Sequence, residues 1–488
     1  MPDSRHYSTA ADAISTEAGN KRISQLLTNI SAMKKISLSI LLLCAILFSC
    51  KQQQKSTAIT AVGNPKNLSD SALLDSVERR TFDFFWTGAE PNSGMAPERI
   101  HMDGDYPDHD QRTVATGGSG FGVMAILAGI ERGYITRQQG EERFEKIISF
   151  LEKADRFHGA FPHWINGENG HVKPFGQKDN GGDLVETSFL FQGLLCVRQY
   201  YKDGNEKEKQ LAARIDKLWK DVDYDWYRNG AQNVLYWHWS PEYAWQMNFP
   251  VHGYNECLIF YVLGASSPTH GVPAEVYQQG WAQNGEISKT TFYKNDTLHL
   301  RYQGNPPHGA SLFWAHYSYL GLDPHGLKDE YANYWKEMSS LAHINYQWCV
   351  DNPKHYAGYS DSSWGLTASY SVKFYAAHAP NDENDLGVIS PTAAISSIPY
   401  TPKESLAAIR HWYENDSLGN VIWGKYGFYD AFSVSEKWCK PWYLSIDQGP
   451  EVAMIENYRS GLLWKLFMSC PEVKDGLKKL GFESPYIK

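Results

Sequence analysis

Apolar residues recur at helical spacing along most of the chain, and this repetition limits the fold more than any other feature of the sequence. From about Leu68 onward, such stretches alternate with loops rich in Gly, Pro and Asp. The ranges with helical periodicity are 73–86, 121–130, 144–151, 184–200, 211–219, 257–264, 310–320, 331–348, 404–413 and 451–468. Strand-like alternation is sparse, and 290–302 is the one segment that is typical of a hairpin.

A succession of about a dozen helices fits a ring of paired helices better than a fold built on a sheet. The expected fold class is therefore all-α: an (α/α)6 toroid with a minor β-hairpin insertion. Because no low-complexity linker divides the body of the chain, we expect a single catalytic domain over 68–488.

The N-terminal segment has the pattern of an exported lipoprotein. Lys34 and Lys35 precede an apolar run at 36–48, which is too short to span a bilayer and typical of a signal-peptide core. The run ends in Leu-Phe-Ser-Cys, which resembles a lipobox with Cys50 as the lipidated residue. A plain signal peptide with an incidental cysteine is the alternative.

These patterns divide the N-terminal part of the chain. We expect a leader and lipoprotein signal peptide over 1–49, with the true start at Met33, and a polar tether over 50–67. The expected location is the cell envelope, periplasmic or outer-membrane, with the membrane contacted only through the N-terminal lipid anchor.

The amino-acid composition and net charge limit the kinds of molecule that the protein is expected to bind. The net charge is −9 and charges of both signs are mixed along the chain, so a nucleic acid is not an expected partner. The 17 Trp and 30 Tyr residues favour a neutral carbohydrate, because flat apolar rings stack on sugar faces. The cysteines are isolated, and the glycines of 117–122 do not form a dinucleotide fingerprint. We expect no metal and no cofactor.

Cleavage of a glycosidic bond usually needs two carboxyl groups, and the first candidate group is Asp179, Asp183 and Glu186. If a helix begins near Asp183, Glu186 lies on the same side of its first turn and Asp179 approaches from the preceding loop. The same spacing is also close to a capping box, in which the acids only stabilise the helix N-terminus. The sequence favours neither interpretation.

Glu256 is the second candidate, because the residues after it are almost all apolar. Burial disfavours the charged form of a carboxyl group and raises its pKa, as a general acid near neutral pH requires. A structural glutamate paired with an arginine or a backbone group is the alternative. His252 and Asn255 add polar groups at its entry, so this turn is expected to face a cavity.

Asp447 and Glu451 are the third candidate group. Gly449 and Pro450 indicate a helix start, which would place Asp447 in a loop and Glu451 in the first helical turn.

Nine ordered motifs resemble the glucoamylase-like domain, the core of glycoside hydrolase family 144, over roughly 68–484. They are ATGGSGFG (115–122), FPHWING (161–167), DLVETSFLFQGLL (183–195), YNE (254–256), SPTH (267–270), WGLTAS (364–369), SPTAAISSIPY (390–400), YGFYDAF (426–432) and IDQGPEVAMIENYRSGLLW (446–464). This resemblance implies an (α/α)6 toroid that cleaves β-1,2-glucan with inversion at the anomeric carbon, in an endo or an exo mode.

The resemblance also implies roles for single residues. Glu256 matches the carboxyl group favoured as general acid, Asp179, Asp183 and Glu186 match the acidic cluster near the cleavage point, and Asp447 matches another acid of the cleft. Which carboxylate is the base stays open. Tyr370 is a departure, because many members carry Asp there. The side chains expected to contact sugar are His163, Trp164, Trp245, His252, Asn255, Trp364 and Glu451, and a core position is the alternative for each Trp.

Two other function classes are compatible with the sequence. A non-catalytic glycan-binding envelope lipoprotein would also be exported, helical and rich in Trp, but it would have no reason to bury Glu256. A polysaccharide lyase on the same toroid would need a basic cleft for uronates, which the negative net charge disfavours.

Overall fold

The computed structural model describes residues 64–107 and 110–487. They belong to one compact unit that extends from Gly63 to the C-terminus. Cys50, the predicted leader and signal peptide, and the tether up to residue 63 lie outside the described residues. Within the described ranges, no helix is long and apolar enough to cross a membrane.

Helices provide most of the regular structure, and every range with helical periodicity overlaps with one. The helices are α1 (Asp70–Trp86), α2 (Thr116–Glu131), α3 (Arg137–Leu151), α4 (Leu184–Tyr201), α5 (Glu206–Lys220), α6 (Leu258–Ser266), α7 (Phe313–His316), α8 (Tyr334–Asp351), α9 (Pro391–Ser396), α10 (Pro402–Glu414), α11 (Asp416–Ile422), α12 (Ser445–Ser460), α13 (Leu462–Met468) and α14 (Pro471–Lys479). Short 3₁₀ or π turns also occur at η2 (Trp226–Arg228), η3 (Val276–Trp281), η4 (Gln283–Gly285) and η5 (Tyr317–Tyr319).

The helices fall into two groups by burial. In α2, every residue from Thr116 to Ile130 is buried, and α6 and α9 are buried along their whole length. By contrast, α3, α5, α10 and α14 bury one face and expose the other. A helix that is apolar all round must be enclosed by other helices, whereas an amphipathic helix lies at the surface.

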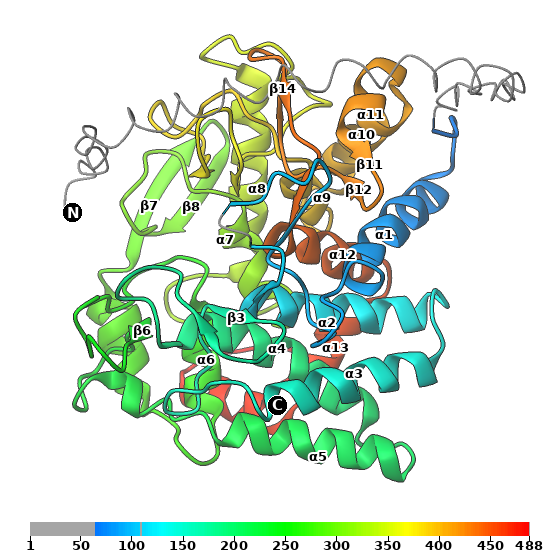
Figure 1. The fold of residues 1–488 in the computed structure, drawn as a ribbon. Coiled ribbons are helices and arrows are strands. Elements are labelled where there is room, and N and C mark those ends of the chain that lie inside the picture. Colours follow the sequence, from blue (N-terminus) through cyan, green and yellow to red (C-terminus); the bar gives the residue numbers. More distant parts are fainter. Residues whose placement is uncertain (1–63, 108–109, 488) are drawn as a thin grey trace, which may run out of the picture. The chain divides into compact units, whose positions relative to one another are not determined.

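Contacts between the helices close the first group into a ring. α12 packs on α2, α2 on α4 and α4 on α6; α6 contacts η5, which continues α7, and both α7 and α9 contact α12. Around this ring, α1 packs on α12 and α2, α5 on α4, α14 on α6, α8 on α7 and α10 on α9. Figure 1 shows α3 and α5 outside α2 and α4. This arrangement is an (α/α)6 toroid, which confirms the predicted fold class.

Two inner helices pack with almost no space between their backbones. A Cβ at Gly120 in α2 would lie 2.2 Å from the carbonyl oxygen of Phe189 in α4, and one at Gly193 in α4 would lie 2.1 Å from the carbonyl oxygen of Gly120. Only glycine allows such an approach. Within the 117–122 segment, Gly120 therefore serves helix packing.

The strands are short and form small antiparallel ladders. The pairs are β1 (Arg99–His101) with β15 (Trp442–Leu444), β5 (Gly182–Asp183) with β6 (His238–Trp239), β7 (Ser288–Tyr293) with β8 (Asp296–Leu300), β9 (Ala368–Ser369) with β10 (Ala376–Ala377), β11 (Trp423–Gly424) with β12 (Gly427–Phe428) and β13 (Phe432–Ser433) with β14 (Trp438–Cys439); β2 (Thr113–Ala115), β3 (Trp164–Asn166) and β4 (Val172–Lys173) form a three-stranded sheet. The β7–β8 hairpin confirms the predicted insertion (Figure 1). Strands of two or three residues are too short to show alternation in the sequence.

The helix predicted over 451–468 is wrong at its start and at its end. α12 begins at Ser445, so Pro450 lies inside the helix and Asp447 lies in its first turn instead of a loop. The helix ends at Ser460, because Gly461 takes a left-handed conformation with φ of 67°, and α13 then starts afresh.

Candidate active site

A cavity of about 450 Å³ lies at the N-terminal ends of the inner helices. Ala115, which precedes α2, Glu186 in the first turn of α4 and Ile446 in the first turn of α12 all line it. Glu256 enters just before α6, and Phe313 is the first residue of α7. Segments that are far apart in the sequence therefore line the same cavity.

The cavity combines acids, cations and aromatic rings. Its carboxyl groups come from Glu98, Glu186 and Glu256, and its basic side chains from Arg99 and His163. The aromatic residues of the lining are Trp164, Phe175, Phe189, Trp237, Phe313, Tyr317, Tyr370 and Tyr375.

Glu256 is electrostatically isolated. No charged partner of its carboxyl group appears among the described residues, and burial raises its pKa to about 7. The turn that carries it is held by Asn255, whose Oδ1 accepts a hydrogen bond from the Cys257 amide at 2.8 Å, and by Ser318, whose hydroxyl donates to the Glu256 carbonyl. A carboxyl group of this kind retains its proton up to neutral pH and can donate it to a bound oxygen.

Glu186 occupies another part of the lining. Its Oε2 accepts a hydrogen bond from the Gly117 amide in the first turn of α2 at 2.7 Å. Burial raises the pKa of Glu186 to about 7; the charge of Asp183 adds to this effect and that of His163 opposes it. A Cβ at Gly117 would lie 2.5 Å from Glu186 Oε2, so this glycine is required for the carboxyl group to dock there.

Asp183 is both the helix cap and the centre of a buried network. Its Oδ1 accepts hydrogen bonds from the amides of Val185 and Glu186 at 3.0 and 2.9 Å, which confirms that it caps α4. Its Oδ2 accepts from His163 Nδ1 at 2.9 Å and from Trp237 Nε1 at 3.0 Å. Asp183 is fully buried and does not line the cavity, so it acts by holding His163 and Trp237.

His163 carries a positive charge into the cavity. Burial opposes the imidazolium, but the charges of Glu186, Asp183 and Asp179 outweigh it and raise the pKa of His163 to about 10. Asp179 lies behind His163, with Oδ2 at 3.9 Å from His163 Nδ1 and 3.4 Å from His238 Nε2.

His163, Asp179 and Asp183 are close enough to share a metal ion. However, Asp183 Oδ2 already accepts hydrogen bonds from both His163 and Trp237. In this structure the ion pair between His163 and Asp183 holds the cluster together.

The side chain of Tyr317 separates Asp447 from the cavity. It is buried, and its Oδ1 accepts a hydrogen bond from the Tyr317 hydroxyl at 3.3 Å, while Tyr317 itself lines the cavity. Burial and the neighbouring Asp430 raise the pKa of Asp447 well above its ordinary value. The structure therefore places Asp447 where it can position Tyr317 but does not expose it to the cavity.

Of the residues expected to contact sugar, some line the cavity and the others do not. His163 and Trp164 line the cavity, where a sugar could reach them. Trp364 is fully buried in the core and donates its Nε1–H to the Glu404 carbonyl, and a ring without exposed surface cannot stack on a sugar. Glu451 is also fully buried and accepts a hydrogen bond from Thr81 at 2.8 Å. The structure therefore contradicts the expected sugar contacts of Trp364 and Glu451.

The other three expected contacts also lie outside the lining. Trp245 packs among Trp226, Tyr227 and Tyr236, with ring centroids 5.5 to 6.4 Å away. His252 Nδ1 is 2.8 Å from the Gly280 carbonyl, and the Asn255 amide group donates to Gln303 at 2.9 Å. These polar groups support the turn before Glu256 instead of facing the cavity.

Sequence reasoning missed Glu98, Arg99, Trp237 and Tyr375. Arg99 is the first residue of β1 and Glu98 precedes it. This strand is too short to show alternation in the sequence, and neither residue belongs to a recognisable motif. Trp237 lies in the aromatic run LYWHW, and that run is the one signal that could have found it.

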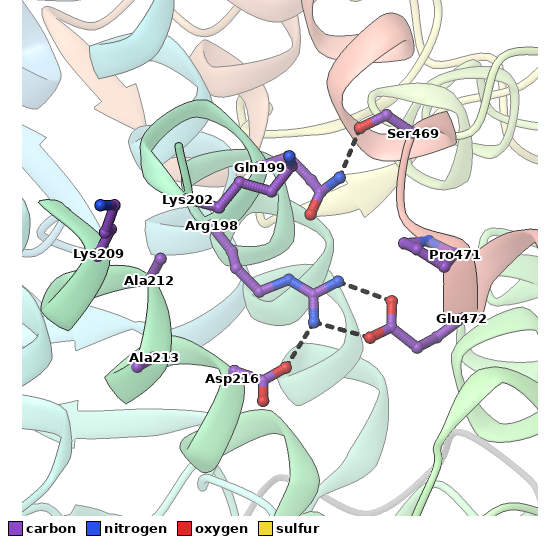
Figure 2. Close-up of a pocket in the computed structure, with 10 residues that line it drawn as sticks. All are labelled: Arg198, Gln199, Lys202, Lys209, Ala212, Ala213, Asp216, Ser469, Pro471 and Glu472. Carbon is purple, nitrogen blue, oxygen red and sulfur yellow. Dashed lines mark hydrogen bonds and ion pairs between the residues drawn. The ribbon is translucent and has the colours of Figure 1, made fainter. Parts of the chain in front are cut away.

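A second pocket, on the outer side of the ring between α4, α5 and α14, has a different character (Figure 2). Arg198 binds Asp216 at 2.6 Å and Glu472 at 2.8 Å, so both carboxylates of the pocket are held in ion pairs. A carboxylate in an ion pair is held in its charged form, so this pocket has no counterpart of the isolated Glu256 among its lining residues. The cavity at the N-terminal helix ends is the candidate active site.

Comparison with known proteins identifies the family of the chain. Residues 248–471 match the family model described as putative glucoamylase. The chain is 67% identical to an endo-β-1,2-glucanase from Chitinophaga pinensis, solved with sophorotriose and glucose; the match has a TM-score of 0.85 and covers 86% of this chain and 100% of that one.

Two further relatives are more distant. The chain is 45% identical to an exo β-1,2-glucooligosaccharide sophorohydrolase of Parabacteroides distasonis over 89% of its length, and it spans 61% of the length of that relative. An endo-β-1,2-glucanase from Talaromyces funiculosus shares only 12% identity at a TM-score of 0.59, which shows a common fold alone. The chain belongs to the glucoamylase-like family of glycosidases, of the glycoside hydrolase family 144 type, that includes its close β-1,2-glucan-hydrolysing relatives.

Proposed function

We propose that the protein hydrolyses β-1,2-glucan, releasing sophorose or short sophorooligosaccharides, by an inverting general acid/base mechanism. The observation that carries this proposal is Glu256, an isolated carboxyl group with a pKa near 7 in a cavity that also holds Glu186. The β-1,2 linkage is supported by the activities of the relatives from Chitinophaga pinensis and Parabacteroides distasonis.

Glu256 is the general acid in this mechanism. Its proton passes to the glycosidic oxygen while the bond from that oxygen to the anomeric carbon breaks. Among the described residues no cation forms an ion pair with Glu256, which suits this role, because an ion pair would stabilise the carboxylate and lower the pKa.

Glu186 is the base. The hydrogen bond from the Gly117 amide and the positive charge of His163 stabilise its carboxylate form. Water attacks the anomeric carbon from the face opposite the leaving group and gives its proton to Glu186. The β-linkage is thereby converted to an α-configured reducing end.

The aromatic lining accounts for recognition of a neutral chain. Trp164, Phe175 and Trp237 present apolar ring surface to the cavity, and a sugar offers C–H faces of matching polarity. Phe175 is 52% exposed and stacks on His163 with ring centroids 4.1 Å apart, so it is fixed at the cavity without being covered.

The test is incubation with linear β-1,2-glucan, following reducing ends, product sizes and the configuration of the first product by NMR. Glu256→Gln is expected to lose at least about 100-fold in kcat with an unchanged circular dichroism spectrum, whereas the exposed Glu206→Gln control retains full activity. Near-native turnover by Glu256→Gln would remove Glu256 from the acid role. A first product of β configuration would contradict inversion, and absence of cleavage by the wild type would refute the function.

For the N-terminal segment, we propose attachment to the cell envelope through a lipid on Cys50. The support is the basic pair Lys34 and Lys35, the apolar run at 36–48 and the Leu-Phe-Ser-Cys sequence that ends it. Metabolic labelling with a radioactive fatty acid tests this directly. The label should appear in the wild type and be absent from Cys50→Ala, and an unlabelled wild type would contradict the anchor.

A further inference from the structure

Tyr370 lines the cavity and is held there from two sides. Its backbone amide donates to Asp430 Oδ2 at 2.8 Å. Its ring meets Trp442 and His101 edge to face, with centroids 4.9 and 5.6 Å apart. The position and orientation of the phenol are therefore set by the protein before any ligand binds.

The Tyr370 hydroxyl has two polar neighbours of different kinds. Arg99 Nη1 donates to its oxygen at 3.3 Å, and His101 Nε2 lies at 3.1 Å. Because a guanidinium has no acceptor, the direction of the first hydrogen bond is certain. The direction of the second depends on which nitrogen of His101 carries the proton.

The surroundings of His101 decide this point. His101 Nδ1 makes a short contact with the Asp105 carbonyl, which can only accept, so Nδ1 carries the proton. The imidazole lies between the rings of Tyr106 and Trp442, with centroids 5.0 and 4.2 Å away, and burial lowers its pKa. In this neutral tautomer Nε2 is an acceptor, and it takes the hydroxyl proton of Tyr370.

Arg99 is fixed as firmly as His101. Its guanidinium lies 5.4 Å from the centre of the Trp164 ring, its Nη2 is 3.6 Å from Glu98 Oε1, and its Nε is 3.4 Å from Asp110 Oδ2. With its proton committed to His101, the Tyr370 oxygen can act only as an acceptor, and the hydrogen bond that it accepts from Arg99 is long at 3.3 Å.

We propose that Tyr370 binds a hydroxyl group of one glucose unit of the substrate as a fixed hydrogen-bond acceptor, with Arg99 and His101 as the positioning residues that orient it. This inference rests on the proposed function, because it takes the ligand to be a neutral glucan. Tyr370 contributes to binding and to the choice of sugar configuration, and it takes no part in proton transfer to or from the reacting atoms.

The test is binding of a β-1,2-linked glucotetraose to catalytically inactive protein, measured by calorimetry. In the Glu256→Gln background, Tyr370→Phe is expected to raise Kd about three- to tenfold, the usual net contribution of one hydrogen bond between uncharged groups. Tyr200→Phe is the matched control, because it removes a hydroxyl that donates to Glu131 at 2.6 Å on an exposed part of the molecule. Its Kd should stay unchanged.

A second pair of variants separates positioning from general loss of structure. His101→Phe keeps a ring between Tyr106 and Trp442 but removes the acceptor for the Tyr370 proton. It should weaken binding when Tyr370 is present and add nothing in the Tyr370→Phe background.

Equal Kd values for Tyr370→Phe and its control, or additive effects of the two substitutions, would overturn the inference alone. Failure of the Glu256→Gln parent to bind the oligosaccharide would overturn the inference together with the proposed function.

Discussion

Replacing Glu256 by Gln is expected to stabilise the folded protein at alkaline pH, because the buried acid costs free energy when it ionises. Burial raises the pKa of Glu256 from 4.5 to about 7. Each tenfold change in proton affinity is worth about 1.4 kcal/mol, which places the cost near 3 kcal/mol. Solvent in the cavity screens part of this energy, so we expect about 2 kcal/mol.

The sign of the pH dependence follows from the two pKa values. Below pH 4.5 the side chain is protonated in the folded and the unfolded chain, and Gln, which resembles the protonated form, changes little. Between pH 4.5 and 7 the unfolded chain releases the proton while the folded protein retains it, so the wild type loses stability relative to the variant. Above pH 7 the difference is constant.

The assay is urea denaturation of the wild type, Glu256→Gln and the exposed control Glu206→Gln at pH 4.5 and pH 8. The free energy of unfolding of Glu256→Gln should exceed that of the wild type by about 2 kcal/mol at pH 8 and by much less at pH 4.5, whereas the control should follow the wild type at both. An equal difference at the two pH values would refute the assignment of Glu256 as a buried, protonated acid.

Three further predictions concern the neighbours of Glu256. The plot of kcat/KM against pH should be a narrow bell centred near 7, since Glu186 must lose its proton and Glu256 must keep it, and both have pKa values of about 7; a broad plateau from pH 5 to 9 would contradict these roles. Gly117→Ala should lower kcat at least about tenfold with the fold retained by circular dichroism, because its Cβ would lie 2.5 Å from Glu186 Oε2 and displace the carboxylate from its position. Asp183→Asn should lower the free energy of unfolding by about 3 kcal/mol in urea titrations, since it leaves the partly buried His163 charge without its fully buried partner at 2.9 Å; a loss below about 1 kcal/mol would show that the pair is dispensable.

Local patterns predicted the parts of the site that depend on one segment of chain. Asp183 begins a helix as its spacing suggested, because one of its oxygens caps α4, while the other accepts hydrogen bonds from His163 and Trp237. The raised pKa of Glu256 likewise follows from the apolar run after it, since that run forms the fully buried helix α6.

The same patterns failed where the site depends on neighbours from distant segments. Asp447, Glu451 and Glu98 all carry a carboxyl group, yet only Glu98 lines the cavity, because Tyr317 covers Asp447 and Glu451 binds Thr81. Trp364 is fully buried in the core, whereas Trp237 lines the cavity, although both residues are tryptophans.

The sequence by itself determined that the chain is helical and that Glu256 would be a buried acid, since periodicity and local burial act within a few turns of the chain. Only the tertiary structure decided which acids and aromatic rings share the cavity. That space lies where the N-terminal ends of α2, α4, α6, α7 and α12 meet, and helices buried on every side carry no periodic signal that marks the face turned toward it.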